Sequence, residues 1–204
     1  MMLVSHPPLF PFSSINRDHP MHKSTKAIHA GTPHSSQYGE VSVPIYQSST
    51  FSFPSAEEGA ARFAGTNGGY IYTRMGNPTT NALEENVAAL ECGFRGLATA
   101  TGMAAITTVF LALLEKGAHI VGTDCVYGPT RRVLETAFAK FGVESTFVDT
   151  SDLGLLRNAL RSNTRVIFLE TPANPTMKLS DIAGAAALAR THGAILVVDN
   201  TFAS

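Results

Sequence analysis

Asp199 is the residue of this sequence whose type and position most clearly suggest chemistry. It follows residues 194–198, AILVV, whose apolar side chains predict a buried strand. A carboxylate at the end of a buried strand needs a partner, because an ionised group away from water is costly. Three partners are compatible with this position: a cap or buried salt bridge, a metal ion, or the protonated ring nitrogen of a pyridine cofactor.

The segment Thr101-Gly102-Met103 is predicted to open a helix directly after a strand. The start of a helix presents N–H groups and the positive end of the helix dipole, which suit a phosphate. Gly102 lets the backbone approach closely, and the Thr101 hydroxyl adds a donor. An ordinary strand-to-helix turn fits the same residues. The sequence contains neither GxGxxG nor a Walker A pattern, which disfavours a Rossmann dinucleotide-binding protein.

Two further loops after predicted strands carry side chains suited to a flat cofactor. Tyr127 places an aromatic ring where it could stack on such a cofactor, or it is an ordinary surface tyrosine. Residues 170–175, ETPANP, are stiffened by two prolines, and Asn174 offers both a donor and an acceptor. A rigid turn in which Glu170 and Asn174 are purely structural is the alternative.

These residues need a scaffold of alternating strands and helices. The patterns predict strands over 96–100, 119–123, 143–148, 166–169 and 195–198, and helices over 102–116, 129–141, 152–160 and 181–192. Such alternation predicts an α/β fold with a mostly parallel sheet that helices cover on both faces. Open α/β sheets bind ligands beyond the carboxyl ends of their strands. We therefore expect the 101–103 segment, Tyr127, Asn174 and Asp199 to converge at one edge.

The sequence before this sheet divides into two predicted regions. Residues 1–24 contain four prolines and are expected to be a disordered leader or a mis-assigned start. Residues 25–78 form the second region, in which residues 25–69 have a loop-like composition and loose alternation over 41–53 favours extended backbone. A long segment of this kind predicts an arm that contacts a neighbouring subunit.

Regular structure is predicted to begin at residue 79. Leu83, Val87 and Leu90 recur at helical spacing behind Thr79 and Thr80, which can cap a helix. Residues 79–204 are therefore predicted to form one incomplete α/β domain.

The composition argues against several classes of protein. Fifteen Lys and Arg residues oppose sixteen Asp and Glu residues, and a charge of −1 argues against nucleic acid or an anionic membrane as partner. The longest mostly apolar stretch, residues 103–114, is shorter than the ~20 residues that span a bilayer. The seven histidines are scattered, so no metal site is expected. Cys92 and Cys125 suggest no disulfide framework, which favours a reducing, cytoplasmic compartment.

Five motifs in order resemble the Cys/Met-metabolism family of pyridoxal 5′-phosphate (PLP) enzymes. They are YIYTRMGNPT at 70–79, ATGMAA at 100–105, YG at 127–128, ETPANP at 170–175 and VVDNTF at 197–202. The family includes methionine and cystathionine γ-lyases, cystathionine γ-synthase, cystathionine β-lyase and O-acylhomoserine sulfhydrylases. The resemblance implies a truncated large, cofactor-binding domain of a type I, aspartate-aminotransferase-like enzyme with an extended N-terminal arm.

The resemblance implies how the cofactor phosphate would be held. Backbone N–H groups of Gly102 and Met103 would bind it beside the Thr101 hydroxyl. Tyr72 and Arg74 would reach across a subunit boundary to the phosphate of a neighbouring active site. This arrangement requires a homo-oligomer, which in this family is a dimer of dimers.

The resemblance also implies how the cofactor ring would be held. Tyr127 would stack over the pyridine ring and take part in proton transfer. Asn174 would lie near the phenolic oxygen of the ring, with Glu170 as support. Asp199 would pair with the ring nitrogen and keep it protonated, while Thr201 would shape the same loop.

The implied activity is cleavage of a carbon–sulfur bond in a sulfur amino acid, giving a 2-oxo acid, ammonia and a thiol. Residues 170–178 and 181–184 favour the methionine and cystathionine γ-lyases. Against methionine γ-lyase, Pro129 stands where those enzymes typically carry cysteine. The alternatives are a γ-replacement enzyme, either a cystathionine γ-synthase or a sulfhydrylase that uses a homoserine ester, and a non-catalytic fragment.

The lysines of the chain bear on its competence. In the family, the lysine that forms a Schiff base with PLP follows the aspartate, whereas every lysine here precedes Asp199. The chain is therefore expected to be a truncated form that is inactive alone.

Overall fold

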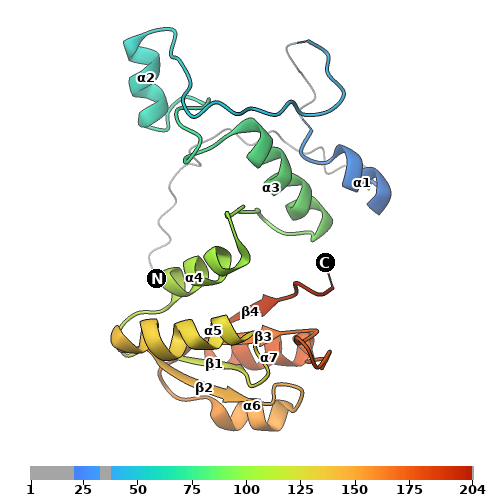
Figure 1. Ribbon diagram of the computed structural model, residues 1–204, viewed down its shortest axis with the longest axis vertical. Helices are drawn as coiled ribbons and strands as arrows, with labels where there is room; N and C mark the ends of the chain where they lie inside the picture. Colours follow the sequence, from blue (N-terminus) through green and yellow to red (C-terminus); the bar gives the residue numbers. More distant parts are fainter. Residues whose placement is uncertain (1–20, 33–37, 204) are drawn as a thin grey trace. The chain divides into compact units, whose positions relative to one another are not determined.

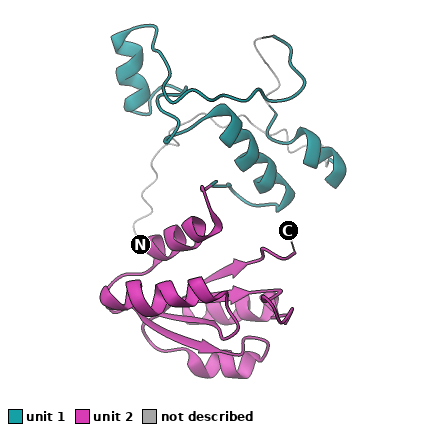
Figure 2. Ribbon diagram, viewed as in Figure 1, with its two compact units in different colours: residues 1–98 teal, residues 99–204 magenta. Residues whose placement is uncertain are grey.

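The computed structural model describes residues 21–32 and 38–203, which belong to two compact units (Figures 1 and 2). The first unit covers residues 1–98 and the second covers residues 99–204. The predicted leader, residues 1–24, lies outside the described residues apart from its last four. Its proposed disorder and the predicted arm therefore stay predictions.

A four-stranded parallel sheet forms the centre of the second unit (Figure 1). Its strands are β1 (His119–Thr123), β2 (Glu144–Val148), β3 (Thr164–Glu170) and β4 (Ile195–Asp199). Their order is β2-β1-β3-β4, and all three pairings are parallel. The chain winds from β1 outward to β2 and then returns past β1 to β3. The direction of winding therefore reverses between β1 and β3.

Helices cover both faces of this sheet (Figure 1). One face carries α4 (Gly102–Leu113), α5 (Gly128–Val133) and the π-helix η1 (Leu134–Phe138), and the other carries α6 (Leu153–Ala159) and α7 (Ile182–His192).

Successive strand residues alternate between the two resulting cores. In β3, Phe168 packs with Phe110 of α4, whereas Ile167 packs with Leu156 of α6. The expected α/β fold with a parallel sheet covered on both faces is confirmed.

The predicted strand over residues 96–100 is wrong. Its backbone contacts α3 (Pro78–Leu90) instead: the Ala98 N–H donates to Glu84 Oε1 over 2.8 Å, and a Cβ on Gly96 would lie 2.4 Å from Glu84 O. A strand needs a neighbouring strand to hydrogen-bond with its backbone. The backbone of this segment contacts a helix instead. The other predicted strands and helices of the second unit are present, with ends shifted by a few residues.

The first unit contains α3 together with α1 (Lys23–His29) and α2 (Ala56–Phe63). Residues 25–69 therefore hold more helix than their composition predicts. The extended backbone expected over 41–53 forms, within the described residues, only one isolated antiparallel bridge, from Thr50 to Tyr72. Side-chain bonds add to this bridge, as when Thr79 Oγ1 donates to Pro44 O over 2.8 Å.

The cap of α3 differs from the predicted one. Asn77 precedes the helix, and its Oδ1 accepts the Thr79 N–H at 2.9 Å. Asn77 is 2% exposed, and its Nδ2 also donates to Tyr46 O over 2.9 Å. Because the helix starts at Pro78, Thr79 and Thr80 lie inside its first turn and cannot be the N-cap.

Among residues 21–32 and 38–203, none of the helices combines the length and apolar character that crossing a membrane requires.

His119 ties the amino ends of three strands together. Its buried ring has Nδ1 2.8 Å from Thr164 Oγ1 and Nε2 2.9 Å from Thr146 Oγ1. Burial lowers the pKa of His119, the Arg161 guanidinium lowers it further, and Glu144 opposes this shift. The imidazole is therefore neutral at pH 7 and bridges two hydroxyl groups.

We expect His119 to make the protein less stable as the pH falls below about 6.5. The unfolded chain binds a proton near that pH, whereas the folded chain binds it only at lower pH, so the free energy of unfolding decreases. His119→Gln, which can hydrogen-bond but does not titrate, should flatten this part of the pH dependence in urea unfolding. His192→Gln is the control, because His192 bonds Arg161 O at the same end of the sheet. Equal pH slopes for wild type and His119→Gln would contradict the expectation.

Candidate functional site

The carboxyl edge of the sheet gathers three predicted site residues where the strand order reverses. Tyr127 follows β1, Asn174 follows β3 and Asp199 ends β4. The crevice at such a reversal is where open α/β sheets bind ligands. The structure thus brings these residues to one edge of the sheet, while their chemical roles stay predictions.

The buried carboxylate of Glu170 joins two loops of this edge. Glu170 is 5% exposed at the end of β3. Its Oε2 accepts the Tyr127 N–H at 2.6 Å, and its Oε1 accepts the Asn174 N–H at 2.9 Å. Bonds to an ionised acceptor are stronger than neutral ones, so the backbone of both loops is firmly held. The Tyr127 residue itself remains 45% exposed and can face a ligand.

Asp199 lies beside Glu170, its register partner across β3 and β4. Its Oδ1 accepts the Thr201 N–H at 3.1 Å and the Thr201 hydroxyl at 2.6 Å. Among the described residues, both hydrogen bonds shown for this carboxylate use Oδ1. Oδ2 makes no hydrogen bond to any described residue.

The start of α4 has the geometry of an anion-binding helix terminus. Thr101 is the N-cap, and its Oγ1 accepts the Ala104 N–H at 3.0 Å. The N–H groups of Gly102 and Met103 then point out of the first turn. Among the described residues, a Cβ built on Gly102 would meet no atom within 4 Å, so the space in front of it is open. Thr130 of α5 donates to Met103 Sδ over 3.8 Å, which places this turn beside the start of α5.

Tyr72 and Arg74 form an exposed cation–π pair in the first unit, whereas the other candidate site residues belong to the second unit. Arg74 Cζ lies 5.2 Å from the centre of the Tyr72 ring, and Tyr72 is 39% exposed. Tyr72 O accepts the N–H groups of Met75 and Gly76 in a tight turn. Asn77, which caps α3, is the next residue after this turn and holds it against the preceding segment.

Sequence reasoning missed a chain of hydroxyl groups beneath the edge. Thr123 Oγ1 accepts the Glu170 N–H at 3.1 Å and lies 2.9 Å from Thr150 Oγ1. Thr150 Oγ1 lies 2.7 Å from Ser180 Oγ. The chain links the ends of β1, β2 and β3 to the segment before α7. A hydroxyl residue after each apolar run was the available signal, but spacing alone does not show which hydroxyls meet.

An ion pair was missed as well. Lys178 bonds to Asp149, the residue that follows β2. The hydrogen bond from Lys178 holds the pKa of Asp149 at about 2, and bonds from Ser151 lower it too. The same contact raises the pKa of Lys178. Lys178 thus serves as a structural cation that ties the loop after Asn174 to β2.

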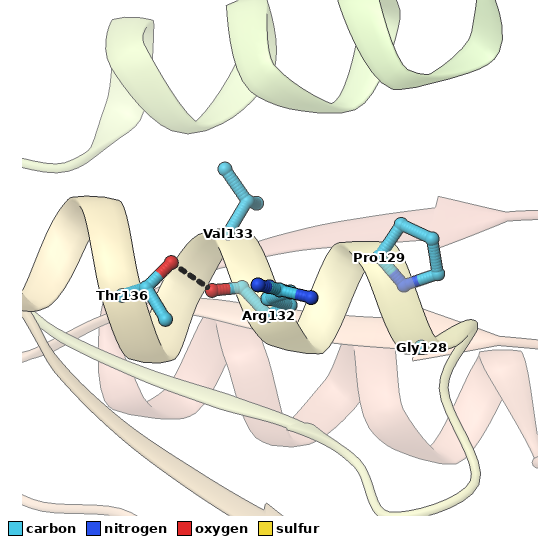
Figure 3. Close-up of a pocket in the computed structure, with 5 residues that line it drawn as sticks. All are labelled: Gly128, Pro129, Arg132, Val133 and Thr136. Atoms are coloured by element: carbon cyan, nitrogen blue, oxygen red, sulfur yellow. Dashed lines mark hydrogen bonds between the residues drawn. The ribbon is translucent and has the colours of Figure 1, made fainter.

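An open depression of about 560 Å³ lies along α5 and η1 (Figure 3). Its lining residues are Gly128, Pro129, Arg132, Val133 and Thr136. Thr136 Oγ1 donates to Arg132 O over 2.6 Å, so both polar residues belong to one helical face. None of the predicted site residues lines this depression.

The start of α4 and the residues of the carboxyl edge fit PLP in three respects. The start of α4 offers N–H groups and open space to a phosphate. Tyr127 offers an accessible aromatic ring to a pyridine. Asp199 offers an oriented carboxylate to a protonated ring nitrogen.

Comparison with known proteins gives a consistent picture. The family described as Cys/Met metabolism PLP-dependent enzyme matches residues 24–204. L-methionine gamma-lyase of Fusobacterium nucleatum is 49% identical over 181 residues, which are 88% of this chain and 46% of that protein. Cystathionine gamma-lyase of Bacillus subtilis is 46% identical over 182 residues, with 89% and 46% covered.

Solved structures show the same likeness. The putative O-acetylhomoserine (thiol)-lyase of Campylobacter jejuni, which contains a pyridoxyl-lysine monophosphate group, matches with a TM-score of 0.82 at 31% identity. The match covers 89% of this chain and 44% of that one. The chain therefore spans less than half the length of these relatives.

Proposed function

We propose that this chain, which belongs to the Cys/Met metabolism family of PLP-dependent enzymes, supplies cofactor-binding residues to a carbon–sulfur lyase. The proposed reaction cleaves the γ C–S bond of a sulfur amino acid such as methionine or cystathionine. It consumes one water molecule and gives a 2-oxo acid, ammonia and a thiol. The observation that carries the proposal is that Tyr127, Asn174 and Asp199 lie at the carboxyl ends of three neighbouring strands, β1, β3 and β4, beside the reversal of strand order.

Each residue has a distinct task in this proposal. When bound, PLP supplies an electron-withdrawing ring that stabilises negative charge on the substrate α-carbon. Asp199 holds a proton on the ring nitrogen, and Thr201 fixes the orientation of that carboxylate. Tyr127 sets the tilt of the ring by stacking, which aligns the bond to be broken. The N–H groups of Gly102 and Met103 bind the phosphate.

A γ-replacement enzyme is the second candidate. It would act on a homoserine ester: the γ C–O bond would break, the carboxylic acid would leave, and a thiol would form the new γ C–S bond. Two observations favour it: Pro129 occupies the position where methionine γ-lyases typically carry cysteine, and the similar Campylobacter structure is a putative thiol-lyase of O-acetylhomoserine.

The exposed pair Tyr72 and Arg74 supports a homo-oligomeric enzyme. The Arg74 guanidinium stacks on the Tyr72 ring, and the turn that carries both residues is held by hydrogen bonds. The positive charge therefore has a fixed position, which suits a phosphate. In the proposal, this pair binds the cofactor phosphate in the active site of a second copy of the chain.

Tyr127→Leu should weaken PLP binding by roughly two- to tenfold, because it removes aromatic stacking but keeps apolar bulk. The measurement is titration of the protein with PLP, followed by absorbance and thermal shift, with NAD as the competing ligand. Tyr38→Leu is the matched control, since Tyr38 is 84% exposed in the first unit. Equal affinities for both variants, or a shift with NAD instead of PLP, would refute the proposal.

A further inference from the structure

We infer that Glu170 is a positioning residue whose single carboxylate sets the Tyr127 loop against the Asn174 loop. Its consequence for the cofactor ring rests on the proposed function, whereas the geometry is independent of it. The two loops follow β1 and β3, the strands between which the winding reverses. A group that bonds to both loops therefore sets the spacing between them.

The hydrogen bonds have the form that such a role requires. Each oxygen of Glu170 accepts one backbone N–H, Oε2 from Tyr127 at 2.6 Å and Oε1 from Asn174 at 2.9 Å. Bonds to backbone fix the path of a loop whatever its side chains do. Since both acceptors belong to one rigid carboxylate, neither loop can move away from Glu170 without losing a charge-assisted bond.

Glu170 is itself immobilised from three directions. Its residue is 5% exposed, so the side chain has little room to move. Its own N–H donates to Thr123 Oγ1 over 3.1 Å, which ties its backbone to the end of β1. Its register partner in β4 is Asp199. Glu170 thus has a fixed relation to Asp199, the third group proposed to contact the ring.

The task requires a carboxylate rather than an amide. Two N–H donors need two acceptor oxygens, and glutamine has one oxygen and one NH₂ group. In Glu170→Gln, one loop would keep its acceptor, while the other N–H would face a donor. The substitution therefore removes the hydrogen bond to one loop and keeps the bond to the other, while the shape of the side chain is almost unchanged.

The test compares Glu170→Gln with wild type by amide hydrogen exchange on the full chain. The amide of Tyr127 or Asn174 that loses its acceptor should exchange at least roughly tenfold faster. Amides within β1 and β3 should be unaffected. The PLP-bound variant should also show a weaker induced circular dichroism band, because a freed loop no longer holds the ring at one angle. Glu135→Gln is the control, since Glu135 pairs with Arg131 on an exposed helix face.

Each result decides the matter. Unchanged exchange at both amides, or an equal increase at every amide of the sheet, overturns the inference. If Glu170→Gln does not fold, through-hydrogen-bond scalar couplings in wild type replace it. Couplings from the Tyr127 and Asn174 amides to the same Glu170 carboxyl carbon support the inference, and coupling from only one overturns it. Wild type that shows both couplings but binds no PLP would refute the proposed function and leave the geometry standing.

Discussion

In a full-length enzyme that contains this chain, Asp199→Asn should lower kcat by roughly a hundredfold or more while the fold stays nearly intact. The proposed task of Asp199 is to keep a ring nitrogen protonated, and that task needs a negative charge. Losing a partnered, partly buried charge costs ~3–5 kcal/mol, and ~1.4 kcal/mol is a factor of ten in rate. Asparagine keeps Oδ1, so both Thr201 bonds survive. Turnover and the melting curve should be measured on the same cofactor-loaded sample.

Asp152→Asn is the matched control for this substitution. Asp152 also accepts a backbone N–H two residues ahead, that of Gly154 at 2.7 Å, but it caps α6 after β2, at the opposite side of the sheet from β4. Its variant should keep both rate and melting temperature. Asp199→Glu keeps the charge on a longer side chain and should restore part of the activity. If Asp199→Asn melts earlier but turns over normally per folded molecule, Asp199 is a structural cap and has no role in the mechanism.

Phe110→Ala should lower the free energy of unfolding of the second unit by about 3–5 kcal/mol. Phe110 is fully buried between α4 and the sheet, with its ring centre 5.3 Å from that of Phe168 and 5.8 Å from that of Phe138. The truncation removes both edge-to-face contacts and leaves a cavity. Since a domain is stable by only about 5–15 kcal/mol, the loss is a large fraction of the total.

Urea unfolding followed by circular dichroism measures this change. Leu111→Ala is the control, because Leu111 is the next residue of the same helix and is 63% exposed. Its effect should be small. Equal destabilisation by the two variants would show that α4 does not pack in the orientation described.

The pattern of the second unit could be predicted because its signals are local. β1, β3 and β4 each contain a short apolar run that ends in a polar residue, and the helices carry their own periodicity. Even Asp199 could be found as the carboxylate that ends an apolar run. The prediction for residues 96–100 was wrong because the segment has a strand-like composition but no neighbouring strand to pair with. Whether such a strand is present depends on the whole fold and not on the local sequence.

What could not be predicted depends on contacts between distant residues. The end of α1 is held by Asn86, whose Nδ2 donates to the carbonyls of Lys26, Ala27 and Ala30. The sequence around residue 26 contains no pattern that predicts these hydrogen bonds. By contrast, α2 had a readable signal, Ser55 followed three residues later by Glu58, which is a capping-box pattern. In the site, a supporting role for Glu170 was expected from family resemblance, but its bonds to two loops were not.

During synthesis, the Tyr127 loop is made before Glu170, the residue that holds it. Residues 119–148 contain β1, α5, η1 and β2, and β1 pairs with β2 in parallel. The acceptor that holds the Tyr127 N–H, however, belongs to residue 170. The strand that carries it must insert beside β1, on the side left open by β2. On the ribosome, the Tyr127 loop therefore lacks this anchor until β3 has been synthesised.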